Sequence, residues 1–133
     1  MNLDKYEKYS PFVLRLGVAF VFLWFGISQL SDPTQWARMI PTYATTITHL
    51  SANTIVHLNG VFEIVFAILL IIGIYTRFVS FILGLHLIHI STILGYGPTA
   101  MRDIALAIVT FSIFLRGADE FCLDSKRKKK EVR

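Results

Sequence analysis

The stretch 55-IVHLNGVFEIVFAILLIIGI-74 is almost entirely apolar and carries one carboxylic acid, Glu63, near its middle. A helix of this length rises about 30 Å, which matches the hydrocarbon core of a bilayer. A charged side chain that faces lipid at such depth costs about 3 kcal/mol or more. We therefore predict a membrane-spanning helix whose Glu63 is sheltered by other helices that cross the bilayer beside it.

The composition favours a single membrane domain over residues 1–125. Hydrophobic residues make up 54% of the chain and charged residues 17%, whereas a typical soluble domain carries about 25% charge. The single cysteine, Cys122, excludes an intrachain disulfide and a metal cage built from cysteines. The N-terminal stretch lacks the character of a cleaved signal, so we expect the first apolar run to remain as an anchor.

Three further apolar runs complete an all-α, integral membrane four-helix bundle. Residues 33–54 are too polar to cross, Pro41 divides them, and Trp36 and Tyr43 suit a membrane surface. We expect this stretch to form short interfacial helices, a lid over one end of the bundle. The predicted spans are about 12–30, 55–74, 78–95 and 99–115.

The distribution of basic residues predicts the orientation. Four spans place both termini on one side, and positive charge marks the cytoplasmic side of a membrane protein. The basic residues on the side of the termini are Lys5, Lys8, Arg77, Arg116 and those of the tail 126–133, against Arg38 and Arg102 on the other. We predict a multi-pass protein of the cell membrane with both termini cytoplasmic and the lid outside. The tail either contacts anionic membrane lipid or is simply solvated, and without a folded basic face no nucleic-acid partner is expected.

Small and polar residues form a stripe on each span, as where membrane helices associate or line a site. The third span differs, because His86 and His89 lie nearly opposite a face of small residues. We expect the two histidines to point inward and the small face to contact a second protomer or a partner subunit. The residues assigned to structure and association are Gly26, Ser80, Gly84, Ser91 and Gly95.

Heights along the helices, at about 1.5 Å per residue, predict which polar groups meet. Glu63 and His89 lie about 18 Å above the cytoplasmic face and Gln29 about 25 Å, and side chains tilt toward the N-terminus of their helix. Glu63 and Gln29 therefore lean toward each other. Arg15 is only about 5 Å deep. It either snorkels or pairs with one of three acids near the C-terminus: Asp119, Glu120 or Asp124.

Several short motifs together resemble the DoxX family over about residues 12–124. They are Arg15-x-Gly17, GISQLSDP at 26–33, Glu63, Leu69-Leu70, GIYTR at 73–77 and GADEFCLD at 117–124. The family includes the DoxD subunit of archaeal thiosulfate:quinone oxidoreductase. The resemblance implies a four-helix membrane protein that serves as a small subunit beside redox proteins of thiosulfate or sulfur oxidation or of oxidative-stress complexes.

Gln29 stands where the family commonly has a lysine that could neutralise the acid corresponding to Glu63. Burying a carboxylate without a counter-charge favours its neutral form. We therefore expect Glu63 to be protonated, or to be paired with a ligand cation or with His89.

Our main functional hypothesis is a non-catalytic or quinone-interacting membrane subunit of a redox complex. A quinone needs an apolar slot with a hydrogen-bond donor near each carbonyl, and Trp24 and Tyr96 are further donors of a suitable type. The chain shows no flavin or iron–sulfur signature, so electrons would come from a partner, and no catalytic residue is assigned. The candidate ligand-binding residues are Glu63, His86, His89, Gln29, Asn59 and Arg15.

Other functions stay open. Haem needs two histidines at matched depth, but His57 lies about 10 Å from the level of His89. A metal held by His86, His89 and Glu63 is conceivable from the ligand types. Buried ionisable residues also mark transport paths, so the chain could carry a small solute, a proton or a lipid. It could equally be a homo-oligomer, or a scaffold that holds a partner enzyme at the membrane.

Overall fold

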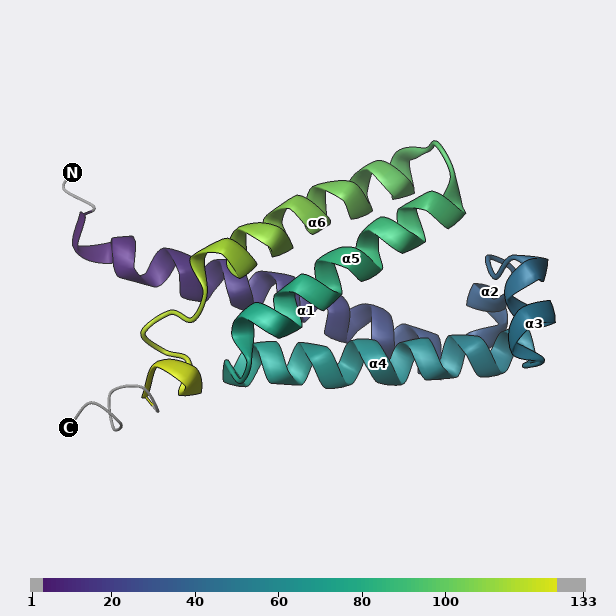
Figure 1. Ribbon diagram of the computed structural model, residues 1–133, viewed down its shortest axis with the longest axis horizontal. Helices are drawn as coiled ribbons and strands as arrows, with labels where there is room; N and C mark the ends of the chain where they lie inside the picture. The colour runs from purple at the N-terminus through teal and green to yellow at the C-terminus, as the bar shows by residue number, and fades with distance from the viewer. Residues whose placement is uncertain (1–3, 127–133) are drawn as a thin grey trace.

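The computed structural model describes residues 4–126, and this part of the chain is helical without strands. Four of its helices are long and apolar enough to cross a membrane: α1, α4, α5 and α6. The elements are η1 (Asp4–Tyr9), α1 (Ser10–Ser31), α2 (Pro33–Ala37), α3 (Thr42–Thr48), α4 (Ala52–Ile72), α5 (Thr76–Leu94) and α6 (Pro98–Arg116) (Figure 1). The predicted fold class, an all-α four-helix membrane bundle with short helices between the first two spans, is confirmed. The basic tail, apart from Lys126, lies outside the described residues.

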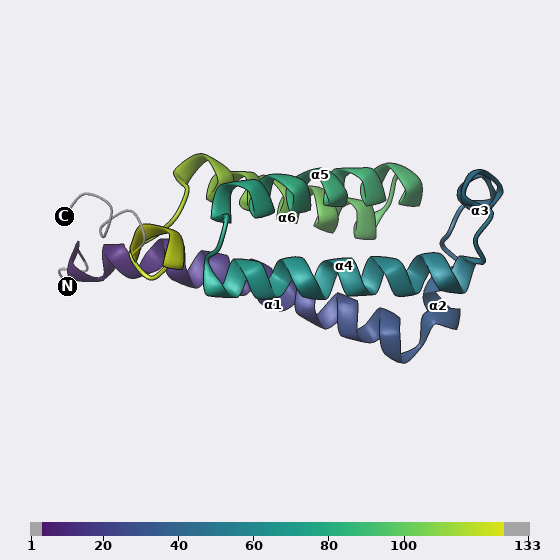
Figure 2. The same cartoon turned by 60° about the horizontal axis from the view of Figure 1, so that its bottom comes forward.

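The four long helices form two layers, each an antiparallel pair (Figure 2). Helices α1 and α4 make one layer, and the hairpin of α5 and α6 makes the other. We call the end of the bundle that holds η1, the 73–75 turn and residues 117–126 the terminal end. The opposite end, which holds α2 and α3, is the lid end. In Figure 1 the α5–α6 hairpin is inclined to α4 and diverges from it toward the lid end.

Glycine allows α1 and α4 to touch through their backbones. A Cβ atom on Gly26 would lie 2.7 Å from a side-chain carbon of Ile64 and 2.8 Å from the carbonyl oxygen of Gly60. Close approach of this kind is how small residues stabilise helix pairs in membranes. The contact fixes the register of α1 against α4 and thereby decides which polar side chains of the two helices meet.

The small-residue face of α5 packs inside the chain, so the prediction that it contacts a second protomer or subunit is wrong. A Cβ atom on Gly84 would lie 3.0 Å from the Phe111 ring of α6, and the Ser91 hydroxyl lies 3.4 Å from the Ala100 carbonyl oxygen. Ser80 is fully buried. Because the layered bundle gives α5 a neighbour on both sides, one face meets α6 while the histidine face turns toward α4. Gly95 instead ends α5 with a positive φ of 70°.

The ends of the helices follow the signals in the sequence. The Ser51 side chain accepts a hydrogen bond from the Thr54 amide at 3.2 Å, which caps α4. Pro33 is the first residue of α2, and α4 ends at Gly73, whose φ is 75°. Buried apolar residues from all four long helices fill the terminal half of the bundle; they are Val18, Ala19, Phe22, Ala67, Leu70, Val79, Leu83, Leu87, Ala107 and Ile113.

Candidate functional site

A cavity of about 380 Å³ lies between the two layers in the lid half of the bundle. Its walls are largely apolar and come from all four long helices. The lid segment contributes six residues to it: Trp36, Met39, Ile40, Pro41, Tyr43 and Ala44. Pockets that hold small molecules have volumes of about 300–1,000 Å³, are mostly apolar and contain a few convergent polar groups. The cavity fits this description in size and in lining.

Four polar side chains meet at the cavity wall, and we call them the Glu63 cluster: Gln29, Asn59, Glu63 and His86. Gln29 Nε2 donates to Glu63 Oε2 at 2.9 Å, and Asn59 Nδ2 donates to Glu63 Oε1 at 3.1 Å. Asn59 Nδ2 also donates to Gln29 Oε1 at 2.8 Å. His86 Nε2 lies 3.2 Å from Glu63 Oε1. Glu63 is thus hidden from lipid by its neighbours, and its predicted contact with Gln29 is confirmed.

The sequence assembles this cluster through simple helix geometry. Asn59 and Glu63 are four residues apart, so they share one face of α4. The contact between Gly26 and Gly60 brings α1 close enough for Gln29, nearly one turn further along, to reach Glu63. His86 reaches Glu63 from α5, and the centre of its imidazole lies 4.9 Å from the ring centre of Phe62 on α4. A carboxylate has about four lone-pair sites, so three side-chain partners leave capacity for a further donor from the cavity.

His86, and not His89, is the imidazole that contacts Glu63, so the predicted pairing with His89 is wrong. The predicted depths of Glu63 and His89 hold only for helices with parallel axes, whereas α5 diverges from α4 toward the lid end (Figure 1). His86, one turn nearer the terminal end, therefore stays within reach of Glu63. His89 lines the same cavity, and its side chain is exposed. The cavity wall therefore presents a carboxyl group and an imidazole in direct contact.

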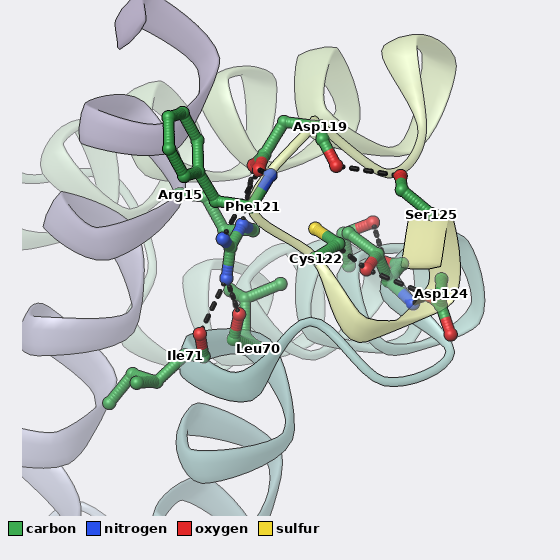
Figure 3. A network of polar contacts seen from close by, with 10 residues as sticks. Arg15, Leu70, Ile71, Asp119, Phe121, Cys122, Asp124 and Ser125 are labelled. Atoms are coloured by element: carbon green, nitrogen blue, oxygen red, sulfur yellow. Dashed lines mark hydrogen bonds and ion pairs between the residues drawn. The ribbon is translucent and has the colours of Figure 1, made fainter. Parts of the chain in front are cut away.

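Arg15 lies away from the cavity, at the terminal end, where only 1% of its surface is exposed. Its Nε atom donates to Asp119 Oδ2 at 2.7 Å, so the predicted pairing with a C-terminal acid is confirmed. Its Nη1 atom donates to the carbonyl oxygen of Ile71 at 2.7 Å and to that of Leu70. Figure 3 shows the guanidinium joining α1, the end of α4 and the segment after α6. We call these residues, with Cys122 and Asp124, the Arg15 cluster.

The rest of the Arg15 cluster holds the C-terminal segment against the 73–75 turn. The Asp124 carboxylate accepts hydrogen bonds from the backbone amides of Tyr75 at 3.0 Å and Thr76 at 2.8 Å. Such bonds satisfy free amides at the start of α5 and place negative charge at its positive end. Cys122 packs so closely that a Cβ atom on Gly73 would lie 2.7 Å from its sulfur. Only glycine fits the turn at that point.

Two side chains outside the membrane spans have altered acidity. Burial raises the pKa of the Cys122 thiol. Burial alone would also raise the pKa of the Asp119 carboxyl, but hydrogen bonds from Arg15 and from the Phe121 amide outweigh it and hold that pKa below its usual value. Asp119 is therefore an ionised partner of Arg15, and the thiol stays protonated near neutral pH.

The sequence predicted a stripe of small and polar residues on the fourth span, but the part of Asp103 in the site was missed. Arg102 Nη2 lies 2.7 Å from Asp103 Oδ1, and both residues line the cavity. Asp103 is only 3% exposed. The Arg102 guanidinium also lies 4.7 Å from the ring centre of Phe25. The signal was an acid directly after a base in an apolar helix, which is easily dismissed because adjacent residues do not normally face each other.

Other candidates from the sequence lie elsewhere. Trp24 and Tyr96 are exposed and are not part of the cavity lining. His57 bonds the Asn53 carbonyl oxygen at 2.8 Å on the outer turn of α4. Within residues 4–126 no three histidine, cysteine, aspartate or glutamate side chains gather closely enough to hold a metal ion. The alternative of a metal bound by His86, His89 and Glu63 is therefore not supported.

Comparison with known proteins agrees with this architecture. The sequence matches the DoxX family over residues 10–96, a stretch that contains the whole Glu63 cluster. The chain belongs to the DoxX family. With four apolar helices of sufficient length, this DoxX chain is a multi-pass membrane protein. The matched stretch ends before α6, so the resemblance at 117–124 stays a prediction.

This DoxX chain is also 32% identical over 88 residues to an uncharacterized protein of Haemophilus influenzae. The matched stretch covers 66% of this chain and 60% of that relative, so the relative is the longer protein. No solved structure matches the DoxX chain.

Proposed function

We propose that this DoxX protein binds a quinone-type molecule in the cavity and serves as a membrane subunit of a redox complex. The observation that supports the proposal is the Glu63 cluster, a set of interchangeable donors and acceptors on the wall of an otherwise apolar cavity. A quinone ring is flat and apolar with two carbonyl acceptors. Amide donors and an imidazole beside an apolar slot suit such a ring.

The proton chemistry of a quinone gives the Glu63–His86 pair a role. Reduction of a quinone to a quinol takes up two electrons and two protons. Glu63 and His86 are in contact at the cavity wall, with 3.2 Å between Oε1 and Nε2, and carboxyl and imidazole groups are side chains that serve in general acid–base catalysis. A partner protein would supply the electrons, since the sequence offers no flavin or iron–sulfur signature. The chain would thus position the ring and move protons.

Binding is favoured over transport by the way the bundle is filled. The cavity lies in the lid half. The terminal half holds the buried core and the Arg15 cluster. A carrier needs a path that opens alternately on both sides, whereas this arrangement suits a pocket with one closed end. We propose the cytoplasmic side for the terminal end, because basic residues of the chain concentrate there.

Binding of a tail-free dimethoxy-methyl-benzoquinone to the purified protein tests the proposal. Saturable binding to the wild type is expected, measured by quenching of tryptophan fluorescence. His86→Leu should weaken it about tenfold, since a hydrogen bond inside a site is worth about 1.4 kcal/mol. Ser80→Ala is the matched control, because Ser80 is buried in the same helix and faces away from the cavity. Absence of saturable binding, or equal loss in both variants, would contradict the proposal.

A further inference from the structure

A shallow groove on the lipid-facing side of α1 and α6 adjoins the cavity. Six residues line it: Phe20, Val21, Trp24, Phe25, Arg102 and Leu106. Four of them also line the cavity, namely Val21, Phe25, Arg102 and Leu106. The groove and the cavity are therefore separated by a wall one side chain thick, built from α1 on one side and α6 on the other.

The groove is built to contact hydrocarbon. Phe20 and Trp24 are 67% and 56% exposed on a membrane-spanning helix, so their surroundings are acyl chains. Apart from Arg102 at its lid end, the lining is apolar. A polar head group would gain little here, whereas an alkyl tail would exchange lipid contacts for contacts with aromatic rings at small cost.

The seam between cavity and groove depends on one aromatic ring. The Phe25 ring lies under the Arg102 guanidinium at 4.7 Å, and it is nearly perpendicular to the rings of Trp24, at 5.0 Å, and of Trp36 in the lid, at 5.6 Å. These contacts close the seam. Phe25 is half-buried and lines both hollows, so a path between them runs past its ring.

We propose that the cavity ligand is a lipid-phase amphiphile whose apolar tail leaves through the α1–α6 seam and lies in the groove. The proposal rests on the proposed function and specifies its substrate class, a quinone ring that carries a long tail. The groove is continuous with the cavity, because the two share four lining residues. A cavity of about 380 Å³ is near the lower limit for ligand pockets, so it holds a ring but not a long tail as well.

Two ligands and two matched variants test the tail site in lipid nanodiscs. The ligands are the tail-free dimethoxy-methyl-benzoquinone and decylubiquinone, the same ring with a decyl tail. Phe20→Asn places a polar group in the groove. Phe78→Asn makes the same change on α5, where Phe78 is 62% exposed and remote from the groove. Partition of a ligand into lipid is the same for both variants, so it cancels in the comparison.

The readout is saturable quenching of Trp36, which lines the cavity, in a Trp24→Phe background, where Trp36 is the remaining tryptophan. Phe20→Asn should weaken binding of decylubiquinone about threefold, because the tail loses its dispersion contacts with the Phe20 ring. Its affinity for the tail-free ring should stay unchanged, and Phe78→Asn should change neither.

The outcomes separate the two proposals. If the tail-free ring binds but Phe20→Asn and Phe78→Asn affect decylubiquinone equally, the groove holds only ordinary lipid and the tail site is overturned. Equal weakening of both ligands by Phe20→Asn would also overturn the tail site, because it would indicate a disturbed cavity. If the tail-free ring fails to bind the parent protein, the proposed function fails, and the tail site fails with it.

Discussion

Two buried ionisable side chains have different surroundings: Arg15 at the terminal end and Glu63 in the lid half. Arg15 donates to an acid and to two backbone carbonyls, and the acid is itself fixed by the Phe121 amide at 2.9 Å. Glu63 is held by side chains alone, and it borders a cavity. The difference indicates that the Arg15 cluster is a joint that fixes the fold, while the Glu63 cluster is able to exchange partners.

Arg15→Met should give the largest loss of stability. It leaves the Asp119 carboxylate buried without its counter-charge, and breaking a buried ion pair in this way costs about 3–5 kcal/mol. The melting temperature in detergent should fall clearly, and the double variant Arg15→Met with Asp119→Asn should recover part of the loss. A melting temperature equal to that of the wild type would mean that the joint does not stabilise the fold.

Acid should weaken the same joint. Because the pKa of Asp119 is lower in the folded protein than its usual 3.8, its contribution to stability is present above pH 3.8 and is lost as the pH falls through the folded pKa. Melting temperatures between neutral pH and the acid limit should therefore fall less steeply for Asp119→Asn than for the wild type. Parallel curves for the two proteins would contradict this role.

Asp124→Ala should have an intermediate effect. It removes the acceptor for the amides at the start of α5, and loss of a cap of this kind costs about 1 kcal/mol. Hydrogen exchange should rise at Tyr75 and Thr76 and stay unchanged at Ser51, which caps α4 at the other end. A uniform rise along the whole chain would indicate a general loss of stability and no local cap.

Glu63→Gln should have the smallest effect on stability, less than that of Arg15→Met, although Glu63 is nearly as deeply buried. The amide has the same shape but keeps only one acceptor oxygen, so it loses one of the two hydrogen bonds that Gln29 and Asn59 donate to separate oxygens of Glu63. The net change should be about 1 kcal/mol. Thermal unfolding of both variants in one detergent checks the order. If Glu63→Gln were the more destabilising, the Glu63 cluster would be a structural joint as well.

The sequence is sufficient for the fold and for part of the site. Helix ends at Ser51 and Gly73 have local signals, and Gln29 meets Glu63 because both side chains lean in predictable directions along antiparallel helices. Depth and charge alone limit Arg15 to snorkelling or to pairing with one of three C-terminal acids, and the structure shows the pair with Asp119. These predictions depend on one helix at a time, or on a pair of parallel axes.

The errors arise where the relative placement of helices decides the outcome. His86 replaces His89 because α5 diverges from α4 by an angle that no local pattern encodes. Gly84 faces α6 inside the chain, because a helix in a two-layer bundle has neighbours on two sides. The ion pair of Arg102 and Asp103 and the cavity itself depend on how far the layers separate at the lid end, which is a property of the whole bundle.

The most direct test of the central claim is an infrared difference spectrum of the protein with and without the tail-free quinone. If the Glu63 cluster binds the ring, the ligand should perturb a carboxyl band in the wild type, and that signal should be absent from Glu63→Gln and retained in Asp119→Asn. A carboxyl signal that persists in Glu63→Gln, or quinone binding with no carboxyl signal at all, would contradict the account.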